Sequence, residues 1–196
     1  MTEGFMEHDH ADLALVFQRL DDALGERDIA LASELLDLAW ARLAVHIRAE
    51  HLHLFPAIQQ ALSVKDQAAD QTLPSAASVR ETIARLLDDH NFLMHEFADA
   101  IKTMRKALTD KSELDSSTDQ LEIIQHQIRG IIKRLNDHNQ IEESEVYRWP
   151  KTLLDKDPRA RLYADMLNEL QNMPPRFANL HLLSGKSVDG KMASDG

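Results

Sequence analysis

Cysteine is absent from this sequence of 196 residues. Its absence excludes disulfide bonds, thiolate zinc sites and iron–sulfur clusters held by cysteine. Glycine and proline are scarce, at six residues each, whereas Ala, Leu, Gln, Glu and Asp are abundant. A chain poor in turn formers and rich in helix formers favours an all-α fold. The length suits one domain with a sizeable core.

The sequence also lacks an excess of positive charge. Its net charge is −11 at pH 7, which disfavours nucleic acid and anionic membranes as partners, because both attract cations. No apolar run reaches about 18 residues, so we expect no membrane-spanning helix. The N-terminus carries acidic residues where a signal peptide would be basic and then apolar. These absences predict a cytoplasmic protein with no nucleic-acid or membrane partner.

Four long segments show helical periodicity. Apolar residues recur in steps of three and four, which places them on one face of a helix. The stripe of the third segment consists of Ile83, Leu87, His90, Met94, Phe97, Ile101, Met104 and Leu108. The sequence therefore predicts an antiparallel up-down-up-down four-helix bundle. Its helices are expected at about 10–24, 29–55, 79–108 and from after the polar segment 109–117 to about 149.

Local signals predict the ends of these helices. Asp28 is an N-cap for the second helix, and Ser78 with Glu81 forms a capping box for the third. Pro56 lacks an N–H donor, so we expect the second helix to end or kink there.

Beyond the bundle, Asp157 and Pro158 are expected to start a short fifth helix that runs to about residue 171. The predicted organisation is a bundle at 1–156, a helical extension at 157–183 and a mobile tail at 184–196.

Two His-x-x-x-Glu pairs, His46 with Glu50 and His138 with Glu142, each place an imidazole and a carboxylate on one helix face. Metal sites in helix bundles are built from such nitrogen and oxygen donors on facing helices. Two buried glutamates without a cation would leave costly unpaired charge. The pairs therefore predict a buried metal site.

Two further histidines fall at the same level of the bundle. Residues at one level of an antiparallel hairpin straddle its turn symmetrically. His10 and His46 are equidistant from residue 28, and His90 and His138 are equidistant from residue 114, so both midpoints fall in predicted loops. All four histidines are therefore expected near one end of the bundle, on faces that point to the core.

The other histidines are expected to lie elsewhere. His8, His51 and His95 are about 140° to 200° around the helix from their neighbouring candidates, so they are interpreted as surface or boundary residues. His126 is too far along the fourth helix, and His181 is in the tail region. His53 is ambiguous, because it shares the stripe of His46 but stands one turn beyond Glu50.

These motifs resemble the hemerythrin-like, HHE cation-binding family over about residues 8–150. The resemblance rests on DHADL around His10, HIRAEHLHLFP from His46, LLDDH ending at His90 and HNQIEE from His138. It implies a four-helix bundle with a non-haem di-iron centre, in which histidines are terminal ligands and two carboxylates bridge the irons. The implied metal ligands are His10, His46, Glu50, His90, His138 and Glu142.

The resemblance has one departure. Oxygen-carrying members have a second histidine four positions after the one matched by His90, where this chain has Met94, and a thioether is a poor ligand for oxidised iron. This favours binding or responding to O2, NO or peroxide, in sensing, redox or iron-handling roles, over reversible oxygen carriage. His53 is a candidate fifth nitrogen if the helix kinks near Pro56.

Several alternatives stay open from the sequence. They are a peroxide- or NO-consuming di-iron enzyme, an iron donor that repairs damaged metal centres, and a site that holds zinc in place of two iron ions. No residue set supplies an obvious nucleophile or acid–base pair beyond the candidate ligands, which weighs against a hydrolase, and a metal-binding protein is expected more than an enzyme. Asp9, Asp89 and Asp137 each precede a candidate ligand, either as solvated carboxylates or as hydrogen-bond acceptors for a histidine on a neighbouring helix.

Overall fold

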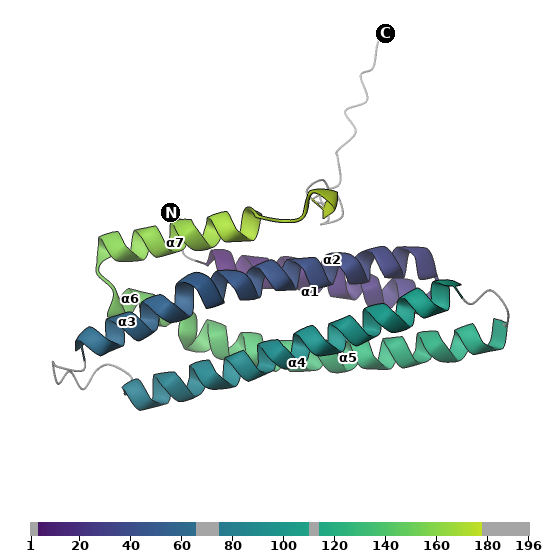
Figure 1. Ribbon diagram of the computed structural model, residues 1–196, viewed down its shortest axis with the longest axis horizontal. Helices are drawn as coiled ribbons and strands as arrows, with labels where there is room; N and C mark the ends of the chain where they lie inside the picture. The colour runs from purple at the N-terminus through teal and green to yellow at the C-terminus, as the bar shows by residue number, and fades with distance from the viewer. Residues whose placement is uncertain (1–3, 66–74, 110–113, 178–196) are drawn as a thin grey trace, which may run out of the picture.

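The computed structural model describes residues 4–65, 75–109 and 114–177, and these residues form helices and no strand. Four long helices, α1 (Phe5–Gly25), α2 (Ile29–Ala49), α4 (Ala76–Thr109) and α5 (Leu114–Ser144), lie side by side along the long axis (Figure 1). Both α1 and α4 contact α2 and α5. The predicted all-α class is confirmed, while the predicted tail at 184–196 lies outside the described residues.

Shorter elements extend the long helices and cover one end of them. A π-helical turn, η1 (Glu50–Leu54), joins α2 to α3 (Phe55–Lys65), and the 3-10 turn η2 (Val146–Arg148) joins α5 to α6 (Trp149–Leu153). Helix α7 (Lys156–Gln171) packs against α2 and η1, and the 3-10 turn η3 (Pro175–Phe177) follows it. No helix in the described part of the chain is long and apolar enough to cross a membrane.

The helix ends match some of the local signals. The Asp28 carboxylate accepts a hydrogen bond from the Leu31 N–H at 3.0 Å, as predicted for an N-cap. The capping box at Ser78 is wrong, because α4 begins at Ala76 and the Ser75 hydroxyl accepts the Ser78 N–H at 3.1 Å. Serine at position 75 supplies the same chemistry three residues earlier. Helix α7 also begins earlier than predicted, and Pro158 falls in its first turn, where no N–H is needed.

The sequence predicted that the second helix ends or kinks at Pro56, but the helical path continues past this residue. The chain passes through η1 and continues as α3, with the Phe55 N–H donating to the Glu50 carbonyl five residues back. A π turn of this kind shifts the hydrogen-bond ladder by one residue, so the helix tolerates a residue without an N–H. The extra residue also rotates the side chains after Glu50 relative to those before it.

Buried apolar residues form two clusters along the long axis. The inner core contains Leu13, Phe17, Leu20, Leu36, Leu43, Leu93, Phe97, Ile128, Ile131 and Leu135, among others, from the four long helices. The outer core contains Met6, Leu54, Phe55, Ile58, Ile83, Leu86, Val146, Trp149, Leu162 and Met166, among others, most of them from the shorter elements and the start of α4. On each of the four long helices, a candidate ligand lies between the residues of the inner core and those of the outer core. The predicted site therefore lies between two cores and not at an end of the molecule.

The buried stripe of α4 is displaced by one residue from the predicted stripe over much of the helix, so that Leu86, Leu93 and Ala100 are buried in place of Leu87, Met94 and Ile101. Leu108 is 44% exposed. His90 lies where the predicted and observed stripes overlap, so its burial is unaffected.

Candidate metal centre

The six predicted ligands converge in the interior. All six are buried, with exposed fractions of 5% for His10 and 2% or less for the other five. The histidines meet in pairs, with Nε2 of His10 3.1 Å from Nε2 of His46 and Nε2 of His90 3.0 Å from Nε2 of His138. Each pair joins two helices, α1 to α2 and α4 to α5. The structure thus brings together four imidazoles from four helices at one level.

The two glutamates connect the histidine pairs. Glu50 places Oε1 3.6 Å from His46 Nε2 and Oε2 3.3 Å from His90 Nε2. Glu142 places Oε1 2.9 Å from His138 Nε2 and Oε2 3.4 Å from His10 Nε2. Each carboxylate therefore has one oxygen beside each histidine pair, as a carboxylate that bridges two cations would.

Two of these carboxylate oxygens have no hydrogen-bond partner. Glu50 Oε2 and Glu142 Oε1 are fully buried, and despite the nearby imidazole nitrogens the geometry makes no hydrogen bond to either atom. Buried charge left in this state is costly unless a cation compensates it. Donor atoms of Glu50, His90, His138 and Glu142 lie within 4.8 Å of one another, as do those of His10, His46 and Glu142. The residues thus fit two cations that share Glu142.

The protonation of the centre favours charged carboxylates. Burial raises the pKa of Glu50, but the charges of His46 and His90 outweigh it and hold the pKa well below its usual range. Burial and the charge of Glu50 raise the pKa of Glu142, but the close imidazoles of His10 and His138 lower it overall. Burial lowers the pKa of His46, yet Glu50 and Asp9 raise it well above its usual value. Without metal, the two carboxylates are therefore ionised beside a protonated His46.

Each histidine is oriented from outside by a second side chain. Asp9 on α1 accepts from Nδ1 of His46 at 2.9 Å, and Asp89 on α4 lies 3.4 Å from Nδ1 of His138. Arg42 in turn donates to Asp9 at 2.8 Å, and Arg134 donates to Asp89 at 2.6 Å. The sequence left open whether these two aspartates are solvated or accept hydrogen bonds from histidines on neighbouring helices. The structure shows them beside the histidine rings.

Asp137 follows the other interpretation, since it is exposed at the surface. Glu143 takes the expected role for His10 instead, with its Oε1 2.8 Å from His10 Nδ1. The sequence analysis did not predict a role for Glu143. Its position directly after the candidate ligand Glu142 was a signal that could have indicated one.

His51 was interpreted as a surface or boundary residue, and it lies at the boundary of the centre beside a candidate ligand. Its Nε2 lies 2.9 Å from His90 Nδ1, and its side chain is half-buried. His51 is the second residue of η1, where the π turn departs from 100° per residue, and its ring packs beside His90 at a centroid distance of 5.0 Å. Burial, followed by the charge of His90, lowers the pKa of His51. The ring is therefore suited to be neutral beside His90.

The remaining histidines lie away from the centre. His8, His95 and His126 are exposed, and the His95 ring bonds to the carbonyl of Asn91 on its own helix. His53 lines a surface cavity between η1, α3 and α7 and belongs to neither donor group found among the described residues. His181 lies outside the described residues.

Tyr147 is a residue of the centre that the sequence did not predict. Its hydroxyl donates to Glu50 Oε1 at 2.8 Å and lies 3.1 Å from Glu142 Oε2. Burial and the charges of the two glutamates raise the pKa of Tyr147 well above its usual value. The phenol is therefore neutral in the protein without metal.

A buried cluster of imidazoles and carboxylates on facing helices is the site of a helical metal-binding protein. The family model described as the hemerythrin HHE cation binding domain matches residues 3–149, and the chain belongs to this family. No curated protein and no solved structure matches it.

Proposed function

We propose that this chain holds a non-haem di-iron centre in an antiparallel four-helix bundle and binds or responds to O2, NO or peroxide. The observation that carries the proposal is the pair of buried, unbonded carboxylate oxygens placed between two histidine pairs. His10 and His46 would hold one ion, His90 and His138 the other, and Glu50 and Glu142 would link them. This donor set of nitrogen and oxygen suits iron, and zinc accepts the same atoms.

A bound iron pair would supply redox chemistry and coordination positions for a small ligand. The residues of the chain supply the rest. Asp9, Asp89, Glu143 and His51 fix the ring orientation of the four histidines, and such partners raise ligand basicity. The apolar clusters on both sides exclude water from the centre.

Burial distinguishes the proposed roles. A donor that passes iron to another protein needs accessible ligands, whereas Glu50 and Glu142 are 0% exposed. The geometry therefore favours a resident centre over a transferable one, and sensing or turnover over repair. The proposed partner is a small diatomic molecule or peroxide.

The test is metal loading of anaerobically purified protein, exposure to air, and then elemental analysis and absorption spectroscopy. Two ions per chain and the near-ultraviolet absorption of oxo-bridged ferric iron are expected, whereas zinc would give no such absorption. Glu50→Ala and Glu142→Ala should each lose both ions. His95→Ala is the matched control, because this exposed histidine touches no candidate ligand. A content of one ion per chain under iron-replete conditions would reject the di-iron proposal.

A further inference from the structure

The two donor groups of the centre are unequal. One contains four residues, Glu50, His90, His138 and Glu142, while the other contains only His10, His46 and Glu142. Glu50, whose Oε1 lies 3.6 Å from His46 Nε2, is outside the compact group on the side of α1 and α2, so the cation there would have a looser set of protein ligands than its neighbour.

The hydroxyl of Tyr147 lies at the poorer of these two groups. Its oxygen is 3.2 Å from His10 Nε2 and 3.3 Å from His46 Nε2, in addition to its contacts with Glu50 at 2.8 Å and Glu142 at 3.1 Å. Two ligands at adjacent corners around one ion, each bound at about 2.1 Å, lie roughly 3 to 3.4 Å apart. The four contacts of the hydroxyl are close to this spacing.

Hydrogen bonding alone does not account for these four contacts. A phenol has one proton to donate, yet two carboxylate oxygens, both acceptors when ionised, lie within 3.1 Å of the Tyr147 oxygen. One hydroxyl proton cannot serve both. A cation among His10, His46 and the glutamates would remove this conflict, because all five side chains would then direct a lone pair at it.

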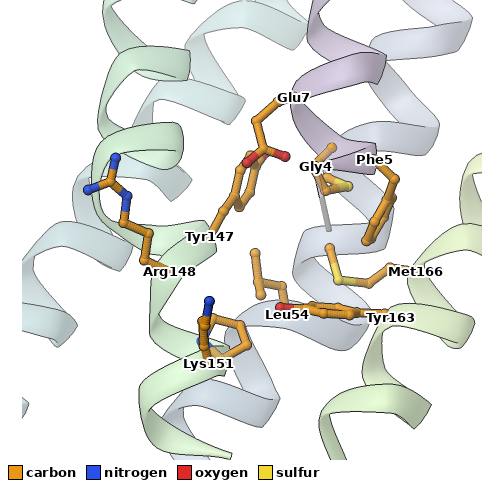
Figure 2. Close-up of a pocket in the computed structure, with 11 residues that line it drawn as sticks. Gly4, Phe5, Glu7, Leu54, Tyr147, Arg148, Lys151, Tyr163 and Met166 are labelled. Atoms are coloured by element: carbon orange, nitrogen blue, oxygen red, sulfur yellow. The ribbon is translucent and has the colours of Figure 1, made fainter. Parts of the chain in front are cut away.

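The fold directs Tyr147 into the centre by breaking α5. On a continuous helix Tyr147 would lie five positions after Glu142, about 140° around the axis and away from the ligands. Helix α5 ends at Ser144, Glu145 leaves the helical conformation with φ −127° and ψ −64°, and η2 follows as a tighter 3-10 turn. Figure 2 shows Tyr147 extending from η2 toward α1, as a wall of a cavity of about 190 Å³.

We propose that Tyr147 is a direct metal ligand, whose phenol oxygen completes the coordination of the ion held by His10 and His46. On binding, the metal–oxygen bond forms as the phenol O–H bond breaks, and the proton is released to solvent. The inference rests on the proposed function. It adds a seventh protein ligand and makes the two metal positions chemically different.

The chain offers a matched control, because Tyr147 and Tyr163 are its only tyrosines. Tyr163 lines the same cavity from α7, where its ring meets Phe5 edge-on at 5.7 Å.

The experiment loads the protein with Fe2+ without oxygen, oxidises it with air, and records absorption and resonance Raman spectra. A visible charge-transfer band with resonance-enhanced phenolate vibrations is expected in the unaltered protein and in Tyr163→Phe. Both should vanish in Tyr147→Phe. If Tyr147→Phe does not fold, Tyr163→Phe alone decides, because Tyr147 is then the single tyrosine.

Two irons per chain without phenolate vibrations would overturn the inference and leave the proposed function standing. Vibrations that persist in Tyr147→Phe would overturn it as well. Failure to bind metal at all would instead reject the proposed function, so elemental analysis separates the two failures.

Discussion

The inner and outer cores differ in how they are built. The inner core is formed by regular stripes on α1, α2, α4 and α5, and its large residues, such as Leu20, Phe97 and Ile128, are almost completely buried. The outer core joins a π turn, a 3-10 turn and three shorter helices, α3, α6 and α7, to the ends of α1 and α4. The metal centre lies at the boundary between the two.

This difference indicates that the inner core can hold its helices together without metal, whereas the packing of the outer core depends on the metal centre beside it. Two elements of the outer core carry site residues directly, since η1 begins at Glu50 and includes His51, and η2 contains Tyr147. Ligand geometry and outer-core packing are therefore coupled, and binding energy at the centre stabilises both.

Removal of metal should produce the largest difference in stability between the two cores. A ligand at a thousand times its Kd stabilises the native state by about 4 kcal/mol, and the metal-free centre keeps two unbonded carboxylate oxygens. Hydrogen exchange should show protection lost first in η1, η2 and α6, while the middle of α1, α2 and α5 keeps its protection. Equal loss along all four long helices would contradict the division into two cores.

Truncation in the two cores should sharpen the comparison. Ile128→Ala in the inner core should lower the free energy of unfolding by about 2–5 kcal/mol, with little change in metal affinity. Ile58→Ala in the outer core removes an equally buried side chain. It should lower global stability less and speed metal release, because it loosens α3 beside η1. Denaturant unfolding and metal transfer to a chelator measure the two effects; if both variants behave alike, the cores are one unit.

A smaller effect is expected from His51, which belongs to η1 and orients His90. His51→Ala should weaken metal binding by about 10- to 100-fold, as loss of such partners typically does. His95→Ala should leave the affinity unchanged. Competition with a chromophoric chelator gives both constants, and equal affinities in the two variants would show that the π turn does not contribute to the centre.

The smallest effect is a dependence of metal affinity on pH. His46 keeps its proton to a higher pH in the folded metal-free protein than in the unfolded chain. This proton stabilises the metal-free fold below the ordinary histidine pKa, and the contribution is lost as the pH rises through the raised value. Metal requires the neutral ring, so affinity should rise with pH by up to about tenfold per unit for this proton. In Asp9→Asn the rise should level off at a lower pH, as chelator competition over a pH series would show.

The sequence by itself determined the all-α class and the candidate ligands, and its motifs determined the family by resemblance. The class and the ligands follow from short-range regularities, because a helix places residues three and four apart on one face and a hairpin pairs positions at equal distance from its turn. His10, His46, His90 and His138 obey both rules, and they converge in the structure. The expected domain limits and cytoplasmic location remain predictions.

Only the tertiary structure decided the features that depend on broken periodicity. The π turn at Glu50 brings His51 to His90, and the end of α5 at Ser144 turns Tyr147 into the centre. A uniform 100° per residue assigns both side chains to the wrong face. The outer core is likewise invisible to periodicity, because its short elements are held by contacts between distant residues. The position of the centre between two cores follows from that packing alone.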